Sequence, residues 1–180
     1  MNLRPVLEQC RYLLLDAGGT RISDYDLVMA TNVGLASLSY QMGQTRNPLL
    51  AKKVTLGSSG STATSVDLPA DLQEIVSVST TVELTPGGAT TAPETGKYGV
   101  MGLKLYVREL PVTLVYVAAL PVVQGVDDEI PLPDGFSSGI RDLVLSAQKR
   151  DMNALATVAA RLARWTSSAS ASSLDRGVFQ

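Results

Sequence analysis

Apolar residues recur at helical spacing at both ends of the chain and at strand spacing in its middle. A first helix is expected over residues 3–16, and the glycine pair 18–19 that follows predicts a left-handed end. Ser23 is placed to cap a second helix that reaches about Met42, with acidic residues close to its positive end. The apolar stripe of the first helix consists of Val6, Leu7, Cys10, Leu13 and Leu14.

The second helix is apolar nearly all round, without the polar face of a helix that borders water. Gly34 lies inside it and predicts close packing of its backbone against another element. A helix of this kind is covered on several sides, and we expect a neighbouring subunit to provide one of the covers. The residues expected at this subunit interface are Leu27, Val28, Val33, Leu35 and Leu38.

Residues 51–123 have the pattern of a β module. The glycine- and serine-rich residues 57–61 predict a hairpin turn between the first two strands, and residues 85–96 a long exposed loop. The last strand is apolar on both faces, which is typical of a strand covered on both sides. Turns at this spacing indicate an inserted antiparallel sandwich or barrel-like module. The expected strands are 52–56, 63–68, 72–84, 103–108 and 112–123.

Two prolines prevent a helix before Asp134, which is placed to cap the next one. The apolar stripe of that helix is out of phase with the stripe that follows it. A break is therefore expected near Asp151, which can itself act as a cap. The two stripes are Phe136, Ile140, Leu143, Val144 and Ala147, and then Met152, Leu155, Ala156, Ala159, Leu162 and Ala163.

The C-terminal end combines a large aromatic residue with a low-complexity segment. Trp165 is followed by the Ser- and Ala-rich residues 166–173 and then by the apolar pair Val178 and Phe179. Such an end is typical of a tether that orders on a partner, or of a frayed tail without a role. The place of Trp165 beside this segment favours an interface anchor over a core anchor.

These patterns predict an α+β fold. N-terminal helices (1–50) and C-terminal helices (124–165) are expected to pack together as one helical module. The β module (51–123) is an insertion between them, and residues 166–180 are expected to form a flexible tail.

The composition of the chain narrows the range of function classes that fit it. Of the 180 residues, 45% are hydrophobic and only 18% are charged, so we expect some apolar surface to be buried between subunits. The net charge of −2 gives no strong electrostatic field that would attract nucleic acid or an anionic membrane. The chain has one cysteine, Cys10, and no histidine, which removes the commonest catalytic base and zinc ligand. We therefore expect no enzymatic activity, no cofactor and no metal site.

Three short motifs bear on this expectation. Residues 16–20 (Asp-Ala-Gly-Gly-Thr) resemble the phosphate loop of sugar kinases of the actin-like ATPase superfamily, but a helical pattern precedes them where those kinases have a strand. Residues 57–61 lack the second glycine of a nucleophile elbow. Residues 127–129 (Asp-Asp-Glu) are adjacent acidic side chains that diverge in an extended segment, so a solvated turn is favoured over a calcium site.

A larger pattern runs through residues 68–71 (Leu-Pro-Ala-Asp), 97–102 (Lys-Tyr-Gly-Val-Met-Gly) and 114–116 (Leu-Val-Tyr). It continues through 128–133 (Asp-Glu-Ile-Pro-Leu-Pro) to a helix that contains Arg-Asp at 141–142. With the order of two helices, a β insert, two helices and a tail, it resembles the head-to-tail adaptor (connector or head-completion) proteins of tailed bacteriophages. The likeness covers about two thirds of the chain.

The resemblance implies a structural virion protein of the phage neck that is assembled in the host cytoplasm. Such adaptors form a ring, commonly of twelve subunits, between the portal and the tail or next neck protein, and they line the channel through which DNA passes without sequence-specific binding. The other classes considered are another neck or tail-completion component, and an enzyme that uses carboxylates alone, such as Asp16, Asp128 and Glu129. The residues expected to contact the portal are Arg161, Leu162, Trp165, Leu174, Val178 and Phe179.

Overall fold

The computed structural model describes residues 1–58 and 64–174, with residues 165–174 described by their backbone alone. The chain forms two compact units. The helical unit contains Met1–Leu49 and the chain from Ala119 onward, and the β unit is Leu50–Ala118. The fold is therefore α+β, with helices from both ends of the chain packed together and a sheet inserted between them, as the sequence predicts. The insertion ends at Ala118, five positions before the expected boundary at 123.

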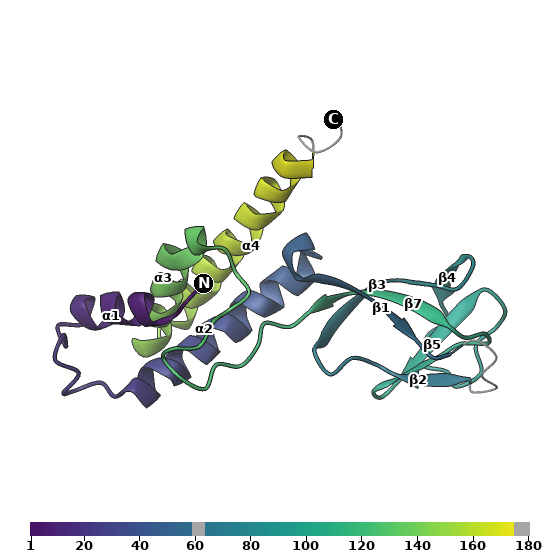
Figure 1. The fold of residues 1–180 in the computed structure, drawn as a ribbon, viewed down its shortest axis with the longest axis horizontal. Helices are drawn as coiled ribbons and strands as arrows, with labels where there is room; N and C mark the ends of the chain where they lie inside the picture. The colour runs from purple at the N-terminus through teal and green to yellow at the C-terminus, as the bar shows by residue number, and fades with distance from the viewer. Residues whose placement is uncertain (59–63, 175–180) are drawn as a thin grey trace. The chain divides into compact units, whose positions relative to one another are not determined.

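Helix α3 is the centre of the helical unit, because it contacts each of the other three helices (Figure 1). Of its predicted stripe, Ile140, Leu143 and Val144 are buried, as is Phe136 in the 3-10 turn before it, while Ala147 is only half-buried. The bounds are α1 (Arg4–Leu13), α2 (Asp24–Gln44), α3 (Ser137–Gln148) and α4 (Met152–Leu174), with short 3-10 turns at Pro48–Leu50 and Asp134–Phe136.

Two glycines allow the close approach of these helices. A Cβ added at Gly34 of α2 would lie 3.1 Å from the Cβ of Leu143, so the close packing predicted at Gly34 is confirmed. A Cβ at Gly139 of α3 would lie 2.8 Å from Leu162 Cδ1 of α4. Real Cβ atoms essentially never approach so closely, which means that α3 and α4 pack at a distance that only glycine permits.

The helix ends follow the capping chemistry of the sequence, with two differences. Ser23 caps α2 as predicted, in a capping box in which its side chain accepts the N–H of Asp26 at 3.1 Å. Asp151 caps α4, where its carboxylate accepts the N–H of Ala154 at 3.0 Å. The left-handed residue that follows α1 is Leu15 (φ 56°), ahead of the predicted glycine pair. Asp134 starts a 3-10 turn and makes no side-chain cap there.

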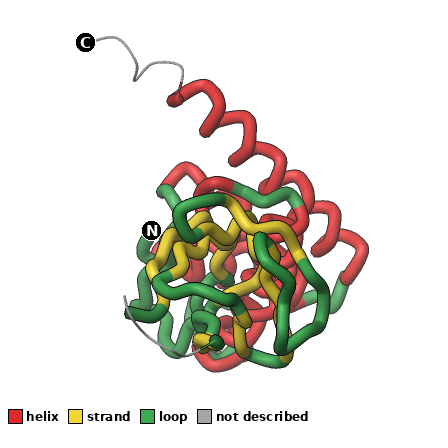
Figure 2. Tube along the Cα trace, turned by 90° about the vertical axis from the view of Figure 1, so that its right-hand side faces the viewer, coloured by secondary structure: helices red, strands yellow, loops and turns green. Residues whose placement is uncertain are grey.

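The β unit is one curled, mostly antiparallel seven-stranded sheet, a half-barrel (Figure 2). The predicted hairpin is wrong: β1 pairs with β7 and β2 pairs with β6, so the first two strands lie at opposite edges of the sheet. β4 and β5 pair in parallel. The strands are β1 (Ala51–Leu56), β2 (Ser65–Asp67), β3 (Leu72–Ser79), β4 (Glu83–Pro86), β5 (Lys97–Met101), β6 (Lys104–Tyr106) and β7 (Val112–Ala118). Their order in the sheet is β1-β7-β3-β4-β5-β6-β2.

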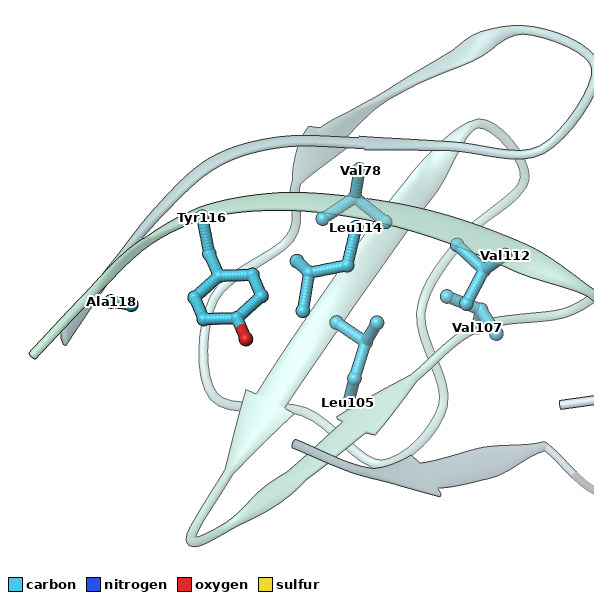
Figure 3. Packing of buried hydrophobic residues seen from close by; sticks show 7 residues of the cluster. All are labelled: Val78, Leu105, Val107, Val112, Leu114, Tyr116 and Ala118. Atoms are coloured by element: carbon cyan, nitrogen blue, oxygen red, sulfur yellow. The ribbon is translucent and has the colours of Figure 1, made fainter. Parts of the chain in front are cut away.

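The core of the β unit fills the inside of this curl. Leu114 from β7 and Leu105 from β6 point toward one another, with Tyr116 beside them (Figure 3). The Tyr116 hydroxyl donates to Asp71 at 3.0 Å, and Asp71 also pairs with Lys52 of β1 at 2.5 Å. Lys52 is the main reason that the pKa of Asp71 lies below its usual value. This group of polar side chains ties β1, β7 and the turn before β3 together.

The last helix is longer than the sequence predicts. α4 continues to Leu174, so residues 166–174, expected to be part of a flexible tail, are helical. Val178 and Phe179 lie outside the described residues. None of the helices in the described ranges is long and apolar enough to cross a membrane.

Candidate functional site

The most unusual surface of the helical unit is an exposed apolar stripe along α2. Tyr25 is 70% exposed, Met29 46%, Val33 44% and Tyr40 57%, and Ala36 between them is exposed as well. We call these five residues the α2 stripe. A helix normally turns polar side chains toward water, so an unbroken apolar row on the outer face needs an explanation.

The spacing of the α2 stripe matches that of a helix-packing seam. At roughly 100° per residue, its five positions fall within about 80° of one another. From Met29 onward the intervals are four, three and four residues, the alternation found along the seam between two packed helices. The stripe is therefore shaped to receive another helix.

A loop is anchored to α2 by hydrogen bonds. The Asn32 side chain makes two hydrogen bonds to the backbone of Val123, one at 2.9 Å and one at 2.8 Å. The hydroxyl of Ser39 accepts the N–H of Leu120 at 3.0 Å. These bonds hold the loop against α2, and Val122 within it is 77% exposed. This loop, anchored to α2, thus exposes one further apolar side chain.

The opposite face of α2 is the core of the helical unit, which corrects most of the predicted subunit interface. Leu27 and Leu38 have no exposed surface, Leu35 is 3% exposed and Val28 7%. These four side chains are covered by the protein's own helices, since the face around Gly34 packs on α3. Only Val33 of the predicted set lies on the surface. Sequence reasoning missed Tyr25, Met29, Ala36 and Tyr40, although their spacing was the signal that could have found them.

The predicted portal residues are only partly placed by the structure. Leu162 is 6% exposed and packs under α3, so it is a core residue and the expectation that it faces a partner is wrong. Arg161 is on the surface, with its guanidinium 3.5 Å from Asp142. The side chains of Trp165 and Leu174, and the whole of Val178 and Phe179, lie outside what the structure describes.

The kinase-like loop is held together by its own aspartate. The Asp16 carboxylate, in a residue only 4% exposed, accepts the backbone N–H groups of Thr20, Arg21 and Ile22 at 3.0, 3.0 and 2.8 Å. Burial opposes ionisation of this carboxyl, but the three N–H donors outweigh it and hold the pKa of Asp16 below its ordinary value. Because its oxygens accept hydrogen bonds from the backbone of this loop, the carboxylate is not placed to position a metal-bound phosphate.

The acidic run at 127–129 diverges, as the sequence predicts. Asp127 pairs with Arg4 of α1, while Asp128 accepts the backbone N–H of Gln124 at 2.7 Å and of Gly125 at 3.1 Å. Asp127 therefore ties this segment to α1, and Asp128 stabilises its own turn. Within the described ranges, no group of three or more Asp, Glu, Cys or His side chains could hold a metal ion.

A hollow of about 360 Å³ in the β unit lies beside two cationic side chains, Lys97 and Arg108. Lys97 is paired with Glu94 at 2.8 Å, and Arg108 donates its Nε to the carbonyl of Pro93 at 2.9 Å. Both cations are therefore engaged with the loop that forms the wall of this hollow, which favours a structural role.

Comparison with known proteins gives no family for this chain. No protein-family model matches it, and no curated protein matches it. The function must therefore be argued from its surfaces.

Proposed function

We propose that this protein is a structural virion component, a head-to-tail adaptor that forms a ring between the portal and the tail or next neck protein of a tailed bacteriophage. The observation that carries the proposal is the exposed α2 stripe, a helix-shaped apolar surface that has no cover within the described part of its own chain. A ring provides such a cover in every subunit, because each copy meets a neighbour on both sides.

The chain's charge is compatible with a channel that DNA must pass through. A lining that gripped phosphates would need a concentration of lysine and arginine, whereas the net charge here is −2. Localisation in the virion neck after assembly in the host cytoplasm belongs to the same proposal. The proposal also includes contact with the portal through the C-terminal end, from Arg161 to Phe179. Leu162 is excluded from this contact because it is buried.

The mass of the purified protein in solution tests the ring. We expect a closed oligomer, commonly of twelve subunits, by native mass spectrometry and by negative-stain electron microscopy. Met29→Glu places a charge in the α2 stripe and should reduce the assembly to monomers. Met152→Glu is the matched control, since Met152 is 61% exposed but lies outside the stripe, and it should assemble like the wild type.

Two results would contradict the proposal. A wild-type protein that stays monomeric over a hundred-fold range of concentration, alone and mixed with portal, would exclude a ring. A protein that forms a ring but binds the tail tube instead of the portal would be a different neck component. Circular dichroism of both glutamate variants is the control for folding.

A further inference from the structure

The helical unit exposes a second apolar surface, where α1 ends. Tyr12 is 74% exposed, Leu13 51% and Leu15 83%. We call these three residues the α1 patch. Next to it is a hollow of about 500 Å³ lined by Pro5, Glu8, Gln9, Tyr12, Leu13 and Arg141. Tyr12 and Leu13 thus line a hollow that an incoming side chain can enter, and the exposed Leu15 follows them in the chain.

Leu15 has an unusual conformation for its residue type. Its φ of 56° is left-handed, which costs a leucine roughly 1 kcal/mol or more and which Gly or Asn adopts far more readily. The conformation is fixed from both sides: the Leu15 N–H bonds to the carbonyl of Tyr12 at 3.1 Å, and Asp16 anchors the residues that follow. The loop therefore holds a strained leucine with most of its side chain in water. Stability of the monomer gives no reason for leucine here.

The α1 patch and the α2 stripe are separate surfaces. Arg11, on the other side of α1, pairs with Asp24 at the start of α2 at 2.5 Å. Arg4 pairs with Asp127 on that same polar side. Arg4, Arg11 and Asp24 line a polar hollow of about 560 Å³, so this side of α1 belongs to neither apolar surface. Two unlike apolar surfaces on one unit are what a heterologous interface requires, because each copy offers one surface to each neighbour.

One pair of opposite charges and the exposed aromatic area are compatible with contact between the two surfaces, and the tyrosines alone supply only part of a stable interface. Asp26 borders the α2 stripe and stays ionised, since the hydroxyl and the N–H of Ser23 hold its pKa below the ordinary value. Arg21 borders the α1 patch and donates to the Leu15 carbonyl at 3.4 Å, whereas Arg141 in the hollow is already paired with Asp142 at 3.0 Å and Glu8 is there too. At roughly 200 Å² per aromatic side chain, the exposed parts of Tyr12, Tyr25 and Tyr40 amount to about 400 Å². That is about a quarter of the ~1,600 Å² that a stable interface buries in total.

We propose that the α2 stripe of one copy packs against the α1 patch of a second copy, with the Tyr12–Leu13 hollow receiving side chains of the stripe. This contact is heterologous, and it rests on the proposed function because it supplies the side-to-side interface of the ring. The partner of each surface is therefore the other surface on an identical chain.

Mixing two defective variants tests the pairing. Met29→Glu disables the stripe and Tyr12→Glu disables the patch, and each variant alone should associate at least ten-fold more weakly than the wild type. In the mixture, the intact patch of the first variant meets the intact stripe of the second. We expect one-to-one pairs by native mass spectrometry, and no rings, because the other two surfaces of each pair are blocked.

The variant Leu15→Asn tests the effect on assembly while the fold is kept. Asparagine tolerates the left-handed conformation, so this change should leave the folded unit as stable as before or more so, while it weakens self-association. Leu103→Glu, at a residue that is 81% exposed in the β unit, is the matched control and should assemble normally. Weakened assembly of a fully folded Leu15→Asn protein would support the pairing, and unchanged assembly would overturn it.

The outcomes distinguish this inference from the proposed function. If Met29→Glu blocks assembly while Tyr12→Glu forms wild-type rings, the stripe pairs with something other than the patch, and the inference fails although the ring stands. If the mixture yields no pairs, the inference fails in the same way. If the wild type never assembles, both fail together.

Discussion

Replacing Gly139 by alanine should destabilise the helical unit, because the space for the new methyl group is already filled by Leu162. The added Cβ would lie 2.8 Å from Leu162 Cδ1 and 3.0 Å from Leu162 Cγ. Leu162 is buried and cannot turn outward without losing its own contacts, so α3 and α4 must separate by some tenths of an ångström.

The magnitude follows from two opposing effects. Glycine to alanine inside a helix ordinarily stabilises by about 0.5–1 kcal/mol. Overpacking of a well-packed core costs about 1–3 kcal/mol. Contacts this close place Gly139→Ala in the upper part of that range, about 2–3 kcal/mol. The net loss expected in the free energy of unfolding is therefore about 1–2 kcal/mol. Leu162→Ala by itself removes a buried leucine and should cost about 2–4 kcal/mol.

The double variant is the decisive measurement. With Leu162 shortened, the methyl group introduced by Gly139→Ala no longer collides and fills part of the space left by the leucine. The double variant should therefore be more stable than the sum of the two single losses predicts, by about 1–2 kcal/mol. Urea unfolding followed by far-UV circular dichroism, which reports mainly on the helices, gives the three values.

Additive losses would refute this reasoning, because they would mean that Gly139 and Leu162 do not share one space. So would a neutral or stabilising Gly139→Ala. The experiment also tests the placement of Leu162, since a residue on a partner-binding surface would tolerate alanine with little change in the free energy of unfolding.

Two further predictions concern the loop at Asp16 and the C-terminal end. The folded pKa of Asp16 is lower than its unfolded value, so its stabilisation is present above the ordinary carboxyl pKa of 3.8 and is lost as the pH falls through the folded pKa. Asp16→Asn should therefore be less stable than the wild type at neutral pH, with a gap that narrows in acid; a constant gap in urea titrations would contradict this. On the proposed adaptor function, deletion of residues 166–180 should abolish head joining and DNA retention in assembled particles, and unchanged particles would contradict the proposed contact of this end with the portal.

Local chemistry allowed much of the helical unit to be predicted. The Ser23 cap, the break at Asp151 and the buried stripe around Leu143 each depend on residues close together in sequence, where side-chain spacing and hydrogen-bonding options decide the outcome. The end of α1 was less predictable. Asp16 gathers three backbone N–H groups around itself, and this loop places Leu15 in the left-handed position that the sequence pattern assigns to a glycine.

Strand pairing could not be predicted in the same way. A glycine- and serine-rich turn between β1 and β2 has the composition of a hairpin, and nothing local distinguishes it from a longer crossing. The choice is made by β7, whose apolar residues on both faces favour a central position between β1 and β3. Pairing between strands this far apart in sequence depends on the whole sheet.

The α2 stripe is best explained by a contact outside the chain, because its residues are poor choices for the stability of the folded chain alone. Exposed helix positions are filled at least cost to stability by Lys, Glu, Gln or Arg, which are better helix formers than Val or Tyr. Val33 and the two tyrosines of the stripe are weaker choices there, and they leave apolar surface in water. The face around Gly34 already provides the contact between α2 and α3. Residues that lower helix propensity and leave much of their surface in water are explained by a contact made outside the chain, which is the role that the proposed pairing with the α1 patch gives them.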